Sequence, residues 1–166
     1  MGEKPVRRHM LSKRDARIIL REAKERLPGF TLETQNIELV EYEGFTIYRI
    51  KGEPALIRLN DKIIPHVKWL LKHGVGGLPY VKVDQGATRA IGRGANNLMV
   101  PGITGVQGHF NEGDVVVIVD ERYNTPIAVG IALMGSSELR DKLSGERRGK
   151  AIRILHRPGD RIWRST

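Results

Sequence analysis

Gly86-Ala-Thr-Arg-Ala-Ile-Gly-Arg-Gly-Ala-Asn-Asn-Leu-Met-Val-Pro-Gly-Ile103 is the stretch on which the fold of the second half of this chain depends, and it lies between two strand-like segments. Its glycines at positions 86, 92 and 94 are expected to bend the backbone through positive φ and to approach a ligand closely. Arg89 and Arg93 add two planar groups that are always charged. The stretch therefore predicts a surface that faces phosphate groups.

Two phosphate-binding motifs of similar composition are excluded by their spacing. The Walker motif needs Gly-Lys-Ser/Thr five residues after its first glycine, and position 91 is Ile91. A dinucleotide-binding loop needs a third glycine at position 97, which is Asn97, and has an acidic residue further on that is absent here. The glycines alone are also consistent with a turn and a short helix beneath a small barrel, but that interpretation leaves the arginines unexplained.

The charge of the chain is concentrated in two segments. The 166 residues carry a formal net charge of +9. Residues 7–26 hold eight basic and three acidic residues, and residues 140–164 hold nine basic and three acidic residues. Such clusters favour a polyanionic partner, although a solvated helix face explains the first cluster equally well. With no cysteine and no apolar segment of about 20 residues, we expect a cytoplasmic protein without thiolate metal ligands.

The first half of the chain opens on a capped helix. Ser12 precedes a helical pattern and can accept a hydrogen bond from the amide of Asp15, and Pro28-Gly29 ends the helix. Three short strands are predicted at 36–43, 45–51 and 54–60, and Pro65 is predicted in the first turn of a second helix. The apolar stripe of the first helix comprises Ala16, Ile19, Leu20, Ala23 and Leu27.

The second half of the chain is predicted to be mainly β. Gly74-Val-Gly-Gly-Leu-Pro79 breaks any regular element and marks a boundary. We therefore expect an α+β module with the order α-β-β-β-α over residues 1–76 and a mainly β domain over 78–166. Strands are predicted at 80–84, 97–107, 114–121, 126–134 and 149–156, with short helices near 86–92 and 136–143. Val115 to Val119 is apolar without alternation, which predicts a strand buried on both faces.

No catalytic or metal-binding arrangement is visible in the first module. His66 and His73 are seven residues apart, hence on one helical face, but we identify no further ligands. Solvated or helix-capping histidines explain them better. We expect no catalytic residue, no metal and no cofactor.

An ordered set of short motifs runs through the second half of the chain: Val83-Asp84, Gly86-Ala87, Gly94-Ala95-Asn96, Pro101-Gly102-Ile103, Phe110, Gly113-Asp114, Ala128-Val129-Gly130, Gly149-Lys150-Ala151, His156 and Gly159-Asp160-Arg161-Ile162-Trp163. With these motifs, most of residues 78–163 resembles a PUA domain, the small pseudo-barrel RNA-binding module. Residues 1–76 resemble more loosely the pre-PUA domain of the malignant T-cell amplified sequence family and its archaeal relatives. The resemblance implies an α+β module followed by a PUA pseudo-barrel.

The resemblance also implies an RNA-binding face, which in PUA domains is formed by the glycine loop, the first helix and the last strand. Tyr80 and Trp163 are the only aromatic residues expected near that face, and Trp163 is more typical of a core residue than of a stacking platform, so backbone contacts should outweigh base readout. For His156, a packed core histidine is the favoured alternative to direct RNA contact. The predicted RNA-binding residues are Lys82, Gly86, Ala87, Arg89, Arg93, Gly94, Ala95, Asn96, Arg153, His156 and Arg157.

The function implied by the resemblance is non-catalytic and translation-related. The chain is expected to bind tRNA or rRNA and the small ribosomal subunit during initiation, re-initiation or recycling, with a SUI1-domain protein as a partner. Two alternatives stay open. One is a targeting subunit in tRNA or rRNA modification. The other is a protein-docking module whose apolar surface includes Trp69, Leu70 and Val75.

Overall fold

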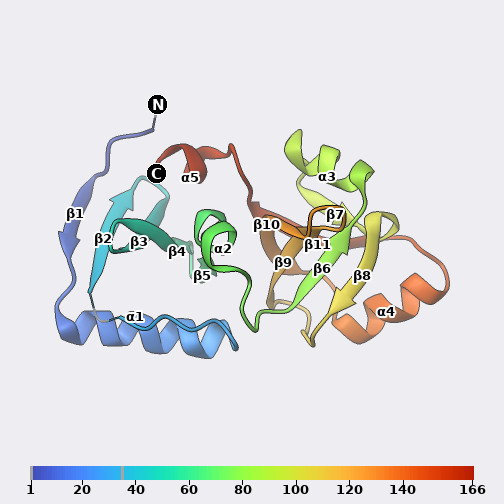
Figure 1. The fold of residues 1–166 in the computed structure, drawn as a ribbon, viewed down its shortest axis with the longest axis horizontal. Helices are drawn as coiled ribbons and strands as arrows, with labels where there is room; N and C mark the ends of the chain where they lie inside the picture. The colour runs from blue at the N-terminus through green and yellow to red at the C-terminus, as the bar shows by residue number, and fades with distance from the viewer. Residues whose placement is uncertain (1, 35) are drawn as a thin grey trace. The chain divides into compact units, whose positions relative to one another are not determined.

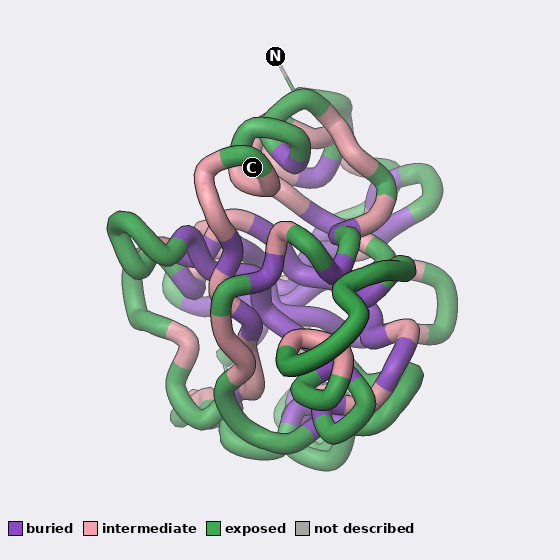
Figure 2. The backbone as a smooth tube through the Cα atoms, turned by 90° about the vertical axis from the view of Figure 1, so that its right-hand side faces the viewer, coloured by how far each residue is buried: buried purple, intermediate pink, exposed green. Residues whose placement is uncertain are grey.

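The computed structural model describes residues 2–34 and 36–166, which form two compact units. Residues 1–77 and 159–166 make up the first unit, and residues 78–158 make up the second. Within these, buried segments are enclosed by exposed ones (Figure 2). No helix in the described parts of the chain is long and apolar enough to span a bilayer.

The described part of the first unit has a five-stranded antiparallel sheet in the order β1-β2-β3-β4-β5 (Figure 1). The α+β class is confirmed, with two strands, β1 and β5, that the predicted order lacked. Both are four-residue strands, too short to show an alternation. Its elements are β1 (Arg7–Met10), α1 (Lys13–Arg26), β2 (Ile37–Tyr42), β3 (Phe45–Ile50), β4 (Glu53–Leu59), β5 (Lys62–Pro65), α2 (Val67–His73) and α5 (Arg161–Arg164).

The helix α1 begins as its sequence predicts and is joined to the sheet by an ion pair. Ser12 Oγ accepts the Asp15 amide at 3.0 Å, which confirms the predicted cap. Ala16 and Ala23 are buried against the unit. Arg58 Nη2 on β4 donates to Glu22 Oε1 on α1 at 2.6 Å, and Arg58 Nη1 reaches the other carboxylate oxygen. This bidentate contact connects the helix to the sheet.

The pair predicts how the stability of the first unit depends on pH. The hydrogen bonds from Arg58 lower the pKa of Glu22. Because the folded state has the lower pKa, the stabilisation is present above the ordinary glutamate pKa of about 4.3 and is lost as pH falls through the depressed value. Glu22→Gln should therefore flatten the dependence of the denaturation midpoint on pH below about 4.3. Parallel urea titrations from pH 6 to pH 2 measure this, and equal slopes in both proteins would contradict it.

The start of α2 differs from the prediction, because Pro65 closes β5 and the helix begins two residues later. His66 caps it: its Nδ1 accepts the Lys68 amide at 3.0 Å, and its side chain is fully buried. His73, at the other end, contacts Glu53 Oε2 at 2.9 Å. The capping role is thus confirmed for His66, and among the described residues no three potential ligands are close enough to hold a metal ion.

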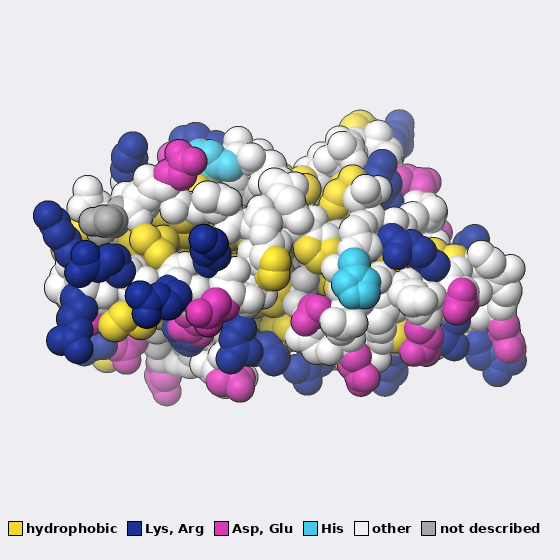
Figure 3. Space-filling model, turned by 90° about the horizontal axis from the view of Figure 1, so that it is seen from below, with side chains coloured by type: hydrophobic (Ala, Val, Ile, Leu, Met, Phe, Trp, Pro, Cys, Tyr) yellow, Lys and Arg dark blue, Asp and Glu magenta, His cyan; other side chains and the backbone are white. Residues whose placement is uncertain are grey.

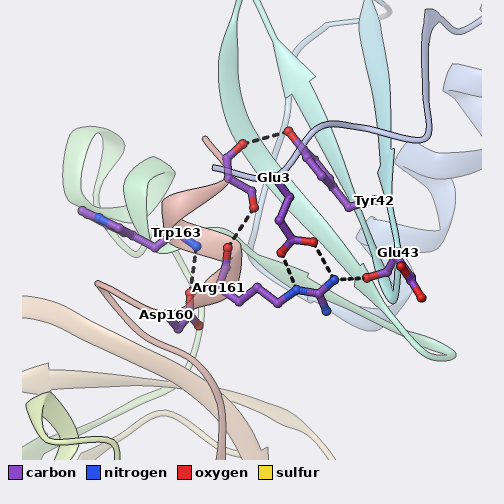
Figure 4. A network of polar contacts seen from close by, with 7 residues as sticks. Glu3, Tyr42, Glu43, Asp160, Arg161 and Trp163 are labelled. Carbon is purple, nitrogen blue, oxygen red and sulfur yellow. Dashed lines mark hydrogen bonds and ion pairs between the residues drawn. The ribbon is translucent and has the colours of Figure 1, made fainter. Parts of the chain in front are cut away.

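The C-terminal segment packs on the first unit, whereas the sequence prediction assigned it to the second domain. Arg161 Nη2 donates to Glu3 Oε1 at 2.8 Å and also contacts the Glu43 carbonyl (Figure 4). Tyr42 Oη donates to the Ser165 carbonyl at 2.8 Å. Lys68 Nζ lies 4.7 Å from the centre of the Trp163 ring. These contacts place Trp163 against α2, so it is a packing residue of the first unit.

The second unit is mainly β, with the described strands in the order β7-β11-β10-β9-β6-β8. All neighbours are antiparallel except β6 and β9, which are parallel. The predicted strand 97–107 is interrupted by the 3-10 turn η1, where Pro101 cannot donate to a ladder. The elements are β6 (Tyr80–Val83), α3 (Gln85–Gly92), β7 (Asn97–Met99), η1 (Val100–Gly102), β8 (Ile103–Gln107), β9 (Val115–Asp120), β10 (Thr125–Ala132), α4 (Ser136–Ser144) and β11 (Lys150–His156).

The core of this unit fixes the position of α3. Ile91 of the helix joins the buried cluster together with Val81 and Val83 of β6. A side chain at Gly102 would place its Cβ 2.7 Å from Ala87 Cβ, so η1 lies directly against the helix. Of the run Val115–Val119 of β9 that was predicted to be covered on both faces, Val115 is half-buried and the other four residues are buried.

Candidate nucleic-acid interface

The helix α3 carries Arg89, and Arg93 follows directly as its C-terminal capping residue. Asp84 caps its first turn by accepting the Ala87 amide at 2.8 Å. Arg89 and Arg93 are exposed and four residues apart, hence neighbours on one side of the helix. By the same periodicity they lie beside the exposed positions Gly86 and Ala90. The arginines therefore border a part of the helix surface that has no bulky side chain.

Among the three glycines expected to have positive φ, only Gly94 does. Its φ of +94° ends α3, with Gly94 N donating to the Ile91 carbonyl and Ala95 N to the Ala90 carbonyl, both at 3.0 Å. This pair of bonds is a Schellman motif, which places glycine at this position. Gly86 and Gly92 lie within α3, so the expectation of positive φ is wrong for both. A helix needs negative φ throughout.

Strand β11 and the residue that follows it bring two further arginines to the segment after α3. A Cβ at Gly94 would lie 3.2 Å from Arg157 Nη2, so the guanidinium of Arg157 lies over Gly94. Arg157 Nη1 also donates to the Pro158 carbonyl at 3.3 Å. The amide of Ile154 donates to the Asn96 carbonyl at 2.9 Å, and Arg153 is paired in register with Asn97. Residues far apart in sequence thus meet at one edge of the sheet.

A groove of about 270 Å³ lies between α3 and the segment that follows it. Gly86 and Ala87 line one side, and Met99, whose side chain is 45% exposed, lines the other. The groove is mainly apolar, and the small residues of α3 keep it open. Its further lining residues are Asp84, Ala90, Ile91, Asn97, Leu98, Pro101 and Gly102.

Most, but not all, of the predicted RNA-binding residues are accessible at this edge. His156 is only 1% exposed, so its side chain is not available to a ligand. Lys82 lies on β6 between the buried Val81 and Val83 and pairs in register with Gly105 of β8, so it belongs to another part of the sheet. The residues brought together are Gly86, Ala87, Arg89, Arg93, Gly94, Ala95, Asn96, Arg153 and Arg157.

The apolar surface suggested for protein docking, which included Trp69, Leu70 and Val75, is smaller than expected because part of it is buried. Leu70 is 1% exposed and belongs to the core of the first unit. The Trp69 ring is covered in part by the His73 ring, with 4.0 Å between their centres. An apolar patch that includes Leu70 is therefore not present on the surface.

Sequence reasoning missed an exposed aromatic residue of the second unit. Tyr123 is 66% exposed in the turn between β9 and β10. The signal was present, because a tyrosine within the polar segment from Asp120 to Asn124 of a hairpin turn has no core to enter.

Comparison with known proteins identifies both halves of the chain. Residues 79–157 match the PUA domain, and residues 7–73 match a domain of unknown function (DUF1947). An uncharacterized protein of Methanocaldococcus jannaschii is 37% identical over 163 residues, which cover 95% of each chain. Translation machinery-associated protein 20 of Saccharomyces cerevisiae is 31% identical over 134 residues, covering 76% of this chain and 71% of the relative.

The fold agrees with this assignment. The crystal structure of a PUA-domain protein from Aeropyrum pernix superposes with a TM-score of 0.85 at 35% identity, covering 95% of this chain and 89% of the other. Both the sequence matches and the fold extend over the N-terminal unit as well as the PUA domain. The chain therefore belongs to the family of RNA-binding PUA-domain proteins with this N-terminal domain, which includes the translation-associated protein of yeast.

Proposed function

We propose that this protein binds RNA without catalysing a reaction and acts in translation, holding the acceptor end of tRNA while it contacts the small ribosomal subunit. The observation that carries the proposal is the meeting of Arg153 on β11, and of Arg157 directly after it, with the segment that follows α3. It is supported by the similarity to a translation machinery-associated protein over most of this chain.

The chemistry of the interface suits an RNA backbone. Arginine guanidinium groups bind phosphate through paired donors, and four arginines lie on or next to α3 and β11, with Arg157 over Gly94. Gly86 and Ala87 leave the groove beside them open to a ribose. Asn96, which is exposed, is placed to contact a base edge. Backbone contacts of this kind fix an RNA end without requiring a particular sequence.

A second cationic surface lies on α1, where Lys and Arg side chains gather (Figure 3). The sheet cations of this unit are mostly neutralised, as in Arg7 with Glu41 and Arg8 with Glu38. By contrast, no described ion pair involves the exposed cations of α1, which suits contact with ribosomal RNA. These cations, the α1 surface, are Lys13, Arg14, Arg17, Arg21, Lys24 and Arg26.

If the α1 surface contacts ribosomal RNA, its cations should contribute to the salt dependence of small-subunit binding, and mutation can measure that contribution. Arg17→Gln with Arg21→Gln should reduce the slope of log affinity against log salt by about 1.8 for small subunits, because two phosphate contacts are lost. Fluorescence anisotropy at several salt concentrations measures it. Arg7→Gln with Arg8→Gln removes the same charge from ion-paired positions and should leave the slope nearly unchanged. Equal slopes in all three proteins would exclude α1 from the contact.

The proposed function is tested by binding of the purified protein to total tRNA, with and without its 3′-terminal CCA, and to isolated small ribosomal subunits. Binding to tRNA that depends on the CCA end, together with association with small subunits, is the expected result. If neither occurs and another structured RNA is retained, the protein is a targeting subunit for RNA modification instead. We also propose that it acts in the cytoplasm with a SUI1-domain protein, which co-purification from cell extract tests.

A further inference from the structure

The turn between β9 and β10 presents an aromatic side chain to solvent. Three aromatic residues occur between positions 78 and 158, all of them described: Phe110 is 1% exposed, Tyr80 is half-buried, and Tyr123 is 66% exposed. The guanidinium of Arg122 lies 5.1 Å from the centre of the Tyr123 ring. Since the ring remains largely exposed with this cation against it, surface for a second planar group is available.

The backbone of this turn is held by hydrogen bonds, so the ring is presented from a fixed support. Asp120 is 5% exposed, and its Oδ1 accepts the Arg122 amide at 2.8 Å. The amide of Glu121 donates to the Val83 carbonyl at 3.0 Å. Thr125 Oγ1 donates to the Tyr123 carbonyl at 3.2 Å. A ligand that stacks on Tyr123 therefore does not have to order the turn.

The same aspartate connects the turn to the beginning of α3. Gln85 Nε2 donates to Asp120 Oδ1 at 3.0 Å, and Gln85 immediately precedes Gly86 and Ala87 of the groove. Asp120 is also paired in register with Val83, the last residue of β6. The turn that carries Tyr123 is therefore joined to the N-terminal end of α3. Arg93 and Gly94 lie at the C-terminal end of the helix, and the rise from Gln85 to Arg93 is about 12 Å over eight residues.

We propose that Tyr123, backed by Arg122, stacks on an unpaired base of the RNA whose backbone is held at the other end of α3. The proposal rests on the proposed RNA-binding function. It adds that the N-terminal end of α3 binds a nucleic-acid base, not a phosphate group. This end has less excess positive charge to attract phosphate, because the Asp84 carboxylate already caps the helix and the exposed Glu121 is set against the single cation of Arg122. A neutral base does not depend on such charge, and every base offers a planar face.

The test uses the full chain and an RNA hairpin with a 3′ single-stranded tail that contains 2-aminopurine. Binding of the unmodified protein should change the fluorescence of the 2-aminopurine through stacking. Tyr123→Ala should lower the affinity for this RNA about tenfold, whereas Tyr123→Trp should retain it. Tyr123→Leu preserves apolar bulk without an aromatic face and should behave like the alanine variant. A blunt hairpin of the same stem should bind all four proteins equally.

The outcomes separate this inference from the function on which it rests. Loss of affinity for the tailed RNA alone, with no change for the blunt hairpin, supports stacking at Tyr123. If the protein binds the tailed RNA through Arg89 and Arg93 but all Tyr123 variants bind it equally, stacking is excluded and the proposed function stands. If the unmodified protein binds neither RNA, both are overturned. Circular dichroism checks folding, which an exposed side chain should not affect.

Discussion

Replacement of Arg89 and Arg93 by glutamate is expected to lower the affinity for RNA about 100-fold at low salt. Both side chains are exposed, on α3 and at its C-terminal cap, and the double replacement changes the charge of this edge by four units. Two phosphate contacts become two repulsions, while Arg153 and Arg157 remain in place. Filter binding or fluorescence anisotropy with tRNA at two salt concentrations measures the effect.

Controls for this prediction must separate local contact from overall charge. Arg147→Glu with Arg148→Glu makes the same change in net charge on exposed residues that follow α4. A much smaller loss of affinity in this variant is expected if α3 contacts the RNA directly. Arg89→Gln with Arg93→Gln, which removes charge without reversing it, should be intermediate. If the α3 variants bind RNA as the unmodified protein does, α3 is not part of the interface.

Substitution of Gly130 by alanine is expected to destabilise the protein by about 3 kcal/mol, through overpacking. An added Cβ would lie 2.3 Å from the Arg153 carbonyl oxygen and 2.6 Å from Ile152 Cγ2. The first is a backbone atom of β11, so strands β10 and β11 would have to separate where their register shifts. Urea denaturation measures the loss, and affinity for RNA should fall as well because β11 carries Arg153.

Gly92→Ala is the matched control for this substitution. Gly92 is the last residue of α3, has no positive φ, and has open space around an added Cβ. Alanine favours a helix over glycine by up to about 1 kcal/mol, so this variant should be as stable as the unmodified protein or slightly more stable. Equal stabilities of the Gly130 and Gly92 variants would show that close approach of β10 and β11 is not required.

Elements with a strong local signal were predicted correctly from the sequence. The cap at Ser12, the buried run of β9 and the helix that begins after Asp84 each depend on residues within a few positions of one another. The short strands β1 and β5 were not predicted, since four residues give too little alternation. These two segments become strands because they pair with β2 and β4, and a neighbour of this kind cannot be identified from four residues.

Much of the candidate interface was predictable, because Arg89, Arg93 and Gly94 lie within six residues of one another. Its geometry was not. The burial of His156 depends on how β11 pairs with β10. Trp163 was expected near the RNA-binding face but packs with Lys68 of the first unit. Tyr123 adjoins α3 only because Asp120 and Gln85 meet across 35 positions.

The sequence by itself determined the class of each half, the position of the glycine-rich segment and the cationic character of α1 and α3. These follow from periodicity, caps and charge, which act over one or two turns of chain. Tertiary structure alone decided that β11 pairs Arg153 with Asn97, that Arg157 after β11 lies over Gly94, and that residues 159–166 pack on the first unit. Such contacts join residues separated by more than fifty positions. They form because they bury apolar surface and satisfy backbone groups, and no local pattern encodes the partner.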